Sequence, residues 1–466
     1  MSLESKLQQI ADCRNEVYSS SAYARLKNLF DEGSMVELDP LVVSENGPAE
    51  VVTAYGTIDG MQVYAFAQNE DIYSGAFSRG QSLKIKKVYD FAVKTGVPVV
   101  GVYSSSGARL RQQGEILAAY GDMLRWTNDL SGVVPQISVI LGACIGTSAL
   151  IASSADIIIV SENADFGIDT AGNNQNAYIS AQLGNIHLVT ETDDEAIAQA
   201  RKIISLLPQN NLSAADSREY DEAENIGGTL TNCAGLIGTN SRVLSYIMSV
   251  VADNGSFIEL SPTFGRSALV GLGTMSGETT GFVGTRSRYA DGKIDSQGAA
   301  KIARFVRFCD AFSIPVVTFV DTMGFTTIRG AAMTANAYAE ATTVKISVIV
   351  GAAYGPAFIA MAGRGANADM AIAWPTAVIA PLAPETVTTI MYNDVIAQSG
   401  NPIAERARLI EEYKDTLASP IKAAGEGFIE DVINPADTRK AILSALDMLS
   451  GKRVSGLPKK HSNIQF

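Results

Sequence analysis

Two short glycine-containing segments of the sequence could bind an oxyanion through the backbone. Residues 142–148 read Gly-Ala-Cys-Ile-Gly-Thr-Ser, and residues 351–357 read Gly-Ala-Ala-Tyr-Gly-Pro-Ala. Each follows a run typical of a strand and precedes a run typical of a helix, so its backbone N–H groups would lack partners and point in one direction. Such a donor stabilises a developing oxyanion by about 2.7–4 kcal/mol. Close packing without catalysis is the alternative interpretation of either turn.

Other kinds of catalytic site find little support in the sequence. His187 and His461 are its two histidines, so a Ser-His-Asp relay has few ways to form. We expect His187 to be a structural histidine in a strand over residues 185–188. No P-loop and no G-x-G-x-x-G after a strand is present, which argues against ATP and dinucleotide sites. The four cysteines form no C-x-x-C pair, so neither a zinc site nor a disulfide framework is predicted.

The two glycine segments belong to a longer internal repeat. Residues 84–85 recur 217 positions later as Lys-Ile, and residues 56–60 recur at the same offset as 273–277. A period above 200 residues is too long for a solenoid, whose units have roughly 20–50 residues. We therefore expect two tandem domains, residues 1–220 and 221–466. Two related pockets could hold a donor and an acceptor, although a repeat kept only for packing is the alternative.

Strands and helices are expected to alternate within each copy. Helical spacing marks residues 1–30, 84–94 and 110–126, and we expect Leu117, Tyr120 and Leu124 to face the core. The second copy begins near Val243, after a polar linker over residues 209–228. The short strands expected in the first copy are residues 35–38, 51–55, 62–67, 99–103 and 157–160. This alternation predicts an α/β fold with a largely buried sheet.

Composition narrows the class of protein further. A net charge of -13 argues against a nucleic-acid partner, which usually requires a basic face. Residues 137–155 and 346–363 are each long enough to cross a bilayer. Internal glycines interrupt both, and Pro356 interrupts the second, so we expect buried strands and helices and no membrane insertion. The polar N-terminal segment lacks the order of a signal peptide, which favours the cytoplasm.

Several ordered motifs then point to a known family. The chain resembles the carboxyltransferase subunit of biotin-dependent acyl-CoA carboxylases and decarboxylases, of the acetyl-/propionyl-CoA carboxylase β type, within the crotonase superfamily. The resemblance extends from Leu26 to His461. Its most specific stretches are residues 30–38, 106–109, 135–142, 303–312, 339–342, 373–377 and 460–461.

The resemblance implies a fold and a reaction. The fold would be two tandem duplicated crotonase-like domains, with the acyl-CoA side in the first and the biotin side in the second. Carboxybiotin would lose carbon dioxide, the biotin nitrogen would take the α-proton of a coenzyme A thioester, and the resulting enolate would attack the carbon dioxide. The implied cofactor is biotin on a separate carrier protein, without a metal. The implied partners are the biotin carboxyl carrier protein, biotin carboxylase and further copies of the chain in a hexamer, with clefts shared between subunits.

The resemblance also implies roles for individual residues. Gly146 and Thr147 would hold the thioester oxygen, whereas Pro356 and Ala357, with Gly355, would hold the ureido oxygen of biotin. Gly324 and Phe325 would lie on the biotin side. The residues implied in acyl-CoA binding are Ser106, Gly107, Ala108, Arg109, Phe358 and Ile359. The apolar residues around Ile359 predict a small acyl group.

Four departures from the family pattern affect these expectations. The first turn has Gly-Thr-Ser where Gly-Gly-Ala is usual, which keeps the backbone donors. Pro356 replaces a glycine and has no N–H to donate. The segment after Phe325 is short and lacks an Ile-Ile-Arg-His stretch, and residues 104–106 are Ser-Ser-Ser where Asp-Ser-Gly is usual. The first site therefore looks more intact than the second.

Two alternatives to an active carboxylase remain at this point. The same residues could run the reverse reaction, in a decarboxylase acting on a malonyl-type CoA or glutaconyl-CoA and coupled to sodium pumping. A degenerate copy could instead serve assembly without catalysis, for which Pro356 and the short segment after Phe325 are the evidence.

Overall fold

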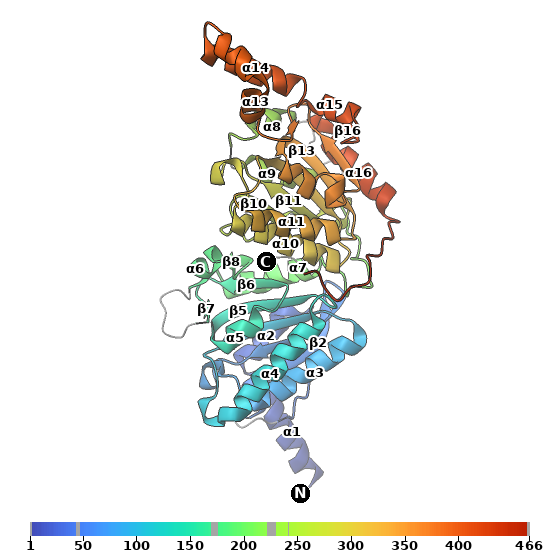
Figure 1. Ribbon diagram of the computed structural model, residues 1–466. Helices are drawn as coiled ribbons and strands as arrows, with labels where there is room; N and C mark the ends of the chain where they lie inside the picture. Colours follow the sequence, from blue (N-terminus) through green and yellow to red (C-terminus); the bar gives the residue numbers. More distant parts are fainter. Residues whose placement is uncertain (1, 43–46, 169–175, 221–229, 241, 464–466) are drawn as a thin grey trace. The chain divides into compact units, whose positions relative to one another are not determined.

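The computed structural model describes residues 2–42, 47–168, 176–220, 230–240 and 242–463. The chain divides into two compact units, Met1–Asp216 and Ser217–Phe466. Figure 1 draws the first unit in blue to green and the second in green to red. The expected linker over residues 209–228 lies at this division, and its part from residue 221 onward falls outside the described residues.

The first unit is built on a mixed sheet with strand order β1-β2-β3-β4-β5-β6-β8, and β7 pairs with β5. The first three strands are antiparallel, whereas β3 to β8 pair in parallel. The strands are β1 Val36–Leu38, β2 Val51–Ile58, β3 Met61–Gln68, β4 Val99–Ser105, β5 Gln136–Ile145, β6 Ile157–Ser161, β7 Phe166–Gly167 and β8 Leu188–Thr190. The helices are α1 Leu3–Tyr18, α2 Ser21–Leu29, α3 Arg79–Thr95, α4 Gln113–Leu130, α5 Thr147–Ala152, α6 Ala177–Gln182 and α7 Asp193–Ile204.

The second unit repeats this topology with strand order β9-β10-β11-β12-β13-β14-β16, and β15 pairs with β13. Its strands are β9 Ile258–Leu260, β10 Ala268–Met275, β11 Glu278–Thr285, β12 Val316–Thr322, β13 Lys345–Tyr354, β14 Met370–Ala373, β15 Val378–Ala380 and β16 Asp431–Val432. Its helices are α8 Leu230–Cys233, α9 Val243–Val251, α10 Ser296–Ala311, α11 Ile328–Glu340, α12 Pro356–Met361, α13 Pro384–Gln398, α14 Pro402–Asp415, α15 Pro420–Gly425 and α16 Thr438–Leu449. Two mixed sheets of matching topology confirm the predicted α/β fold with a duplicated domain.

The core of the first unit explains why these segments fold as they do. All seven residues of β4 are buried, which matches the continuous apolar run of a strand covered on both faces. Helices α3 and α4 pack side by side (Figure 1), and α3 ends at Gly96, whose φ of 64° suits glycine. The core positions predicted for Tyr120 and Leu124 are confirmed, since Tyr120 is buried and Leu124 packs against the core. The prediction for Leu117 was wrong, because Leu117 is 72% exposed and Ile116 and Ala119 face the core in its place.

His187 is a structural histidine. It lies just before β8, and its Nδ1 accepts a hydrogen bond of 3.0 Å from the N–H of Ile158 in β6. The two long apolar stretches form strand–turn–helix segments, β5 with α5 and β13 with α12. Within the described part of the chain, no helix is long and apolar enough to cross a membrane.

Each unit locks its first hairpin with an aspartate and an arginine. Asp31 accepts hydrogen bonds from the N–H groups of Asp59 and Gly60 at the β2–β3 turn and pairs with Arg201 of α7 at 2.7 Å. In the second unit, Asp253 accepts from the equivalent turn and pairs with Arg439. The same arrangement in both units indicates a structural role for Asp31 and Asp253.

This lock predicts acid sensitivity of the first unit. Burial alone would raise the pKa of Asp31, but hydrogen bonds from Gly60, Arg201, Thr57 and Asp59 hold it well below its usual value. Its stabilising contribution is therefore present above the unfolded pKa of about 3.9 and is lost as the pH falls through the lower folded pKa. Asp31→Asn should lower the free energy of unfolding by about 1–2 kcal/mol at pH 7.

Urea unfolding followed by tryptophan fluorescence measures this difference. The gap between wild type and Asp31→Asn should narrow below about pH 4, because protonation removes the same charge from the wild type. Asp90→Asn, in a half-exposed i,i+4 pair with Lys86, is the matched control and should change stability by less than about 0.5 kcal/mol. A difference in the free energy of unfolding that stays constant down to pH 2 would contradict the stabilising role assigned to the Asp31 carboxylate.

Candidate active site

The first glycine turn joins the end of β5 to the start of α5. Gly146 has φ 66° and ψ −132°, a conformation that favours glycine, and α5 begins at Thr147. The carbonyl of Gly146 accepts the N–H of Leu150 at 3.2 Å, which closes the first turn of the helix. The N–H groups of Thr147 and Ser148 precede this bond and have no acceptor among the described residues.

The Gly146 N–H is not available to a substrate in this structure. It donates to the carbonyl of Gly167 in β7 at 3.0 Å, as part of the pairing between β5 and β7. Of the predicted donor pair, Gly146 is therefore engaged within the sheet, and the role of Thr147 as a donor to the thioester oxygen stays a prediction. Gly146 bends the chain, and Thr147 with Ser148 presents the free donors.

A loop from β4 lies against the start of α5. Ser105 Oγ is 3.3 Å from Ser148 Oγ, and the Tyr120 hydroxyl is 3.1 Å from the same atom. The Gly107 carbonyl accepts from Phe77 N–H and the Arg109 N–H donates to the Phe77 carbonyl. The Ala108 N–H, between them, has no acceptor within the described residues. The two backbone bonds of Phe77 hold the loop around Ala108, and the hydroxyl contacts of Ser148 join the end of β4 to the helix start.

The other residues predicted to bind acyl-CoA around this turn differ in exposure. Ser106 is exposed and its N–H donates to the Ser74 carbonyl at 3.0 Å. The Arg109 guanidinium pairs with the buried carboxylate of Glu50 at 3.2 Å and lies 4.0 Å from the ring centre of Tyr73. These contacts orient the loop over residues 106–109. A direct contact of Arg109 with substrate stays a prediction.

The second turn has the same construction with a proline at its helix start. Gly355 has φ 42° and ψ −110°, and its N–H donates to the Ala380 carbonyl at 2.8 Å. Gly355 is therefore not a free donor, and Pro356 has no N–H. The N–H groups of Ala357 and Phe358 remain without an acceptor in the described structure. Proline at the first helical position is well accommodated, because its φ suits a helix.

The other residues predicted to bind biotin or acyl-CoA in the second unit lie after β12 and on α12. Gly324 has φ 130°, and its carbonyl accepts from Ile294 N–H at 2.8 Å. Phe325 forms an isolated parallel bridge with Ile294, just as Ala108 does with Phe77. The segment that follows is short, and α11 begins three residues after Phe325 at Ile328. Ile359 is 59% exposed on the first turn of α12.

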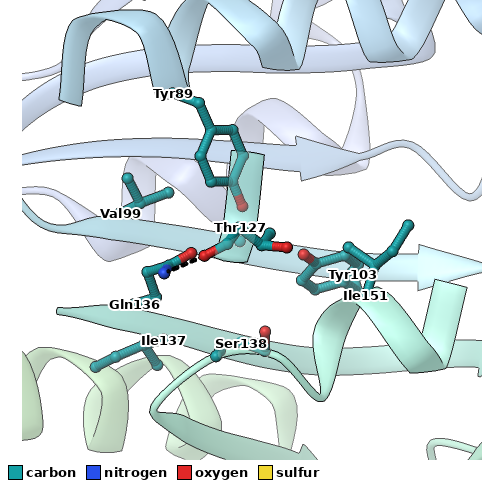
Figure 2. Close-up of a pocket in the computed structure, with 10 residues that line it drawn as sticks. Tyr89, Val99, Tyr103, Thr127, Gln136, Ile137, Ser138 and Ile151 are labelled. Carbon is teal, nitrogen blue, oxygen red and sulfur yellow. Dashed lines mark hydrogen bonds between the residues drawn. The ribbon is translucent and has the colours of Figure 1, made fainter. Parts of the chain in front are cut away.

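A small cavity elsewhere in the first unit is not a substrate site. It has a volume of about 10 Å³, room for about one water molecule, and lies between β4, β5, α3 and α4 (Figure 2). Gln136 Nε2 donates to the Thr127 carbonyl at 2.9 Å, which leaves Gln136 Oε1 buried without a partner in the described residues. Burial raises the pKa of Tyr89 and Tyr103, so both phenols stay neutral. A buried water on Gln136 fits this space.

Comparison with known proteins identifies the family. Residues 19–464 match the carboxyl transferase domain. The chain belongs to the carboxyl transferase domain family. The propionyl-CoA carboxylase carboxyltransferase subunit of Haloferax mediterranei is 34% identical, over 95% of this chain and 93% of its own. The methylmalonyl-CoA decarboxylase α subunit of Veillonella parvula is also 34% identical, over 95% of this chain and 92% of its own.

A solved structure extends the likeness to the whole fold of this carboxyltransferase. The hexameric transcarboxylase 12S, with hydrolysed methylmalonyl-coenzyme A bound, superimposes with a TM-score of 0.93 at 31% identity, covering 100% of this chain and 99% of its own. The predicted crotonase-type fold and the enzymatic class are therefore confirmed. Membership of an enzyme family favours catalysis over a role in assembly alone.

Three polar residues of this carboxyltransferase site were not found from sequence. Ser105, Tyr120 and Ser148 form the hydroxyl cluster beneath the first turn. Ser148 follows Thr147 directly, so its place in the turn was visible, but serine next to a glycine turn is too common to indicate a network. Tyr120 was expected only as a core residue. Its hydroxyl position depends on the packing of α4 against α5, which no local pattern encodes.

Proposed function

We propose that this carboxyltransferase moves a carboxyl group between carboxybiotin on a carrier protein and a short-chain acyl-CoA, converting acetyl- or propionyl-CoA to malonyl- or methylmalonyl-CoA. The observation that carries the proposal is the pair of equivalent turns, each with backbone donors that no described residue uses. Such donors suit an oxyanion that appears only during reaction, because they need no reorganisation to stabilise it.

The first turn would bind the thioester oxygen. When the α-proton leaves, this oxygen gains the negative charge of an enolate. The N–H groups of Thr147 and Ser148, with that of Ala108, are positioned on a helix start and a clamped loop to donate to it. The partial positive charge at a helix N-terminus adds to the same effect. The Tyr120 hydroxyl stays neutral beneath the turn, since burial raises its pKa to about 12.

The second turn fits the ureido oxygen of biotin. Carboxybiotin, when bound, supplies the carboxyl group and the nitrogen that accepts the α-proton. A carbonyl oxygen accepts two hydrogen bonds, and Ala357 and Phe358 offer two free N–H groups. Pro356 rigidifies the helix start beside them. Gly324 and Phe325, on the loop that corresponds to residues 107–108 of the first unit, complete the side that we assign to biotin.

The acyl group should be small. Ile359 is exposed, its neighbour Phe358 is half-buried, and Ala360 and Met361 fill the core behind them. An apolar pocket separates substrates that differ by one methylene by about 1–3 kcal/mol. Acetyl- and propionyl-CoA should therefore both react, at rates that differ by roughly 10–200-fold.

A second candidate function is carboxyl transfer in the reverse direction. A carboxylase subunit and a decarboxylase subunit match this chain at the same 34% identity, so decarboxylation of a methylmalonyl-type CoA is the alternative function. Both directions use the same donors, because the enolate is common to them. The partner proteins differ, namely a biotin carboxylase with its carrier protein for carboxylation or membrane decarboxylase subunits for the reverse.

We further infer that the chain works as a homo-oligomer, and that a hexamer like that of transcarboxylase 12S is its working state. The C-terminal part of the second unit, from α13 to the segment after α15, also carries several exposed large apolar side chains. The most exposed of them are Ile390, Met391, Val395, Ile403, Ile421 and Phe428. Light scattering of the active preparation should give a mass well above that of one chain.

A panel of CoA thioesters tests the proposed function. The purified protein is incubated with free biotin and malonyl-, methylmalonyl- or glutaconyl-CoA, and the decarboxylated CoA product is followed by chromatography. We expect turnover of malonyl- and methylmalonyl-CoA that depends on biotin. Turnover of glutaconyl-CoA alone would assign a decarboxylase of different specificity, and a marked preference for long or charged acyl groups would contradict the proposed small acyl group.

A further inference from the structure

A hydroxyl–carboxylate pair lies beneath the strand that leads to each turn. In the first unit, Ser104 Oγ of β4 donates to Glu70 Oε2 at 2.6 Å. In the second unit, Ser287 Oγ donates to Asp321 Oδ2 of β12 at 2.5 Å. The repeat offset of 217 residues relates Glu70 to Ser287 and Ser104 to Asp321. The two units therefore use the same two positions with the acid and the hydroxyl exchanged.

In each unit the hydroxyl–carboxylate pair lies close to a glycine of the next strand, β5 or β13. A methyl group on Gly142 of β5 would lie 2.3 Å from Ser104 Oγ and 2.9 Å from Glu70 Oε2. A methyl group on Gly351 of β13 would lie 2.2 Å from Asp321 Oδ1. These glycines are four residues before Gly146 and Gly355, so the pairs support the strand segments from which the turns emerge.

The strand pairing beside these glycines is irregular in both units. The register between β4 and β5 shifts after the Tyr103–Ile140 pair, and that between β12 and β13 shifts after the Val320–Ile349 pair. A shift of this kind re-aims the residues that follow it. In the second unit the Ala352 N–H, within the shifted segment, donates to Asp321 Oδ1 at 3.1 Å. The hydroxyl–carboxylate pair therefore holds the backbone of β13 where its regular pairing with β12 is interrupted.

Because the acid and the hydroxyl are exchanged between the two units, the carboxylate lies at a different position in each. Asp321 is 5% exposed, and burial raises its pKa. Glu70 is instead paired with Arg25 of α2 at 2.7 Å, so its charge is compensated. The first unit thus anchors the carboxylate of its pair to a helix outside the pair, α2.

We propose that Glu70 and Ser104 are positioning residues for the first turn, holding β5 at Gly142 so that the N–H groups of Thr147 and Ser148 face the thioester oxygen. The next residue, Ser105, contacts Ser148, so the end of β4 supports both the strand and the helix start of the turn. Glu70 supplies to this pair the carboxylate that Asp321 of β12 supplies in the second unit. This role rests on the proposed function.

An exchange experiment tests the pair. Ser104→Asp alone places a second carboxylate against Glu70 and should lower kcat about tenfold or more, with little change in KM for the acyl-CoA. Glu70→Ser alone leaves the Ser104 hydroxyl without its acceptor and should lower kcat in the same way. The double variant Glu70→Ser/Ser104→Asp reproduces the arrangement of the second unit and should recover kcat to within about threefold of wild type. Asp90→Asn is the surface control.

The same four proteins give a readout that does not need carboxyl transfer. Urea unfolding of wild type, both single variants and the double variant forms a cycle in which contacting residues are non-additive. We expect the double variant to be more stable than the sum of the single changes predicts. Additive stabilities together with additive losses of kcat would overturn the pairing role. A wild type without transfer activity but with a non-additive cycle would instead reject the proposed function and keep the pair as structural.

Discussion

Replacing Thr147 by proline should lower carboxyl transfer by about 10²–10³-fold, because it removes one N–H donor from the first turn. The second unit shows that the turn accepts this residue, since Pro356 occupies the equivalent helix start after a glycine of similar conformation. Proline at this position also keeps the helix, whose first N–H groups have no intrahelical partner. The loss should appear in kcat rather than in KM, because the donor acts on charge that develops in the transition state.

Two variants control this experiment. Thr147→Ala removes the side chain and keeps the N–H, so its activity should stay within about threefold of wild type. Pro356→Gly adds an N–H to the second turn and should leave activity similar or raise it when biotin is limiting. Light scattering confirms that each variant keeps the wild-type mass. Full activity of correctly assembled Thr147→Pro would show that Thr147 is not a donor to the thioester oxygen.

Replacing Lys301 by methionine should lower the stability of the second unit by about 3 kcal/mol. The Lys301 ammonium of α10 donates to three backbone carbonyls, those of Ser261, Phe264 and Ala268, at 2.8, 3.0 and 3.1 Å. Burial lowers the pKa of Lys301 to about 7, so its amine is partly neutral at pH 7. Each of its hydrogen bonds contributes about 0.5–1.5 kcal/mol, and methionine keeps the volume of the side chain without any donor. The three carbonyls fix the segment between β9 and β10 against the helix.

The loss of stability in Lys301→Met is compared with the losses at two other lysines, all measured by urea unfolding. Lys84 is the repeat equivalent, and within the described residues its ammonium donates to a single carbonyl, that of Pro48 at 3.1 Å. Lys84→Met measures the contribution of the equivalent lysine in the first unit. Lys422→Met removes a half-exposed pair with Glu426 and should cost less than about 0.5 kcal/mol. Equal losses for Lys301→Met and Lys422→Met would contradict the assigned role.

The duplicated fold could be predicted from sequence because its signals are local. Apolar runs such as residues 137–141, the glycines after them and the recurrence 217 residues later mark each strand–turn–helix segment without reference to the rest of the chain. Helix faces were predicted less well. Leu117 fits the apolar spacing of α4, yet the helix is rotated so that Ile116 faces the core, and the rotation depends on what packs against it.

The turns could be located from sequence, but their donors could not. Whether the Gly146 N–H is free depends on β7, a two-residue strand whose pairing with β5 has no sequence signature. The same is true of Gly355 and β15. The pair of Glu70 and Ser104 is an intermediate case. The substitution at residues 104–106 was visible as a departure, and its compensation at Glu70 becomes evident only when the strands bring the two side chains together.

Transfer of a labelled carboxyl group tests the central claim most directly, namely that free backbone donors at the first turn drive carboxyl exchange between an acyl-CoA and biotin. The assembled wild-type protein is mixed with carboxyl-labelled methylmalonyl-CoA and a biotinylated carrier domain, and the label on the carrier is counted, with Thr147→Pro and Thr147→Ala in parallel. We expect rapid labelling by wild type and Thr147→Ala, release of that label to added acetyl-CoA, and a rate about 10²–10³-fold lower for Thr147→Pro. Equal labelling by Thr147→Pro and wild type, or no label on the carrier with any malonyl-type donor, would contradict this claim.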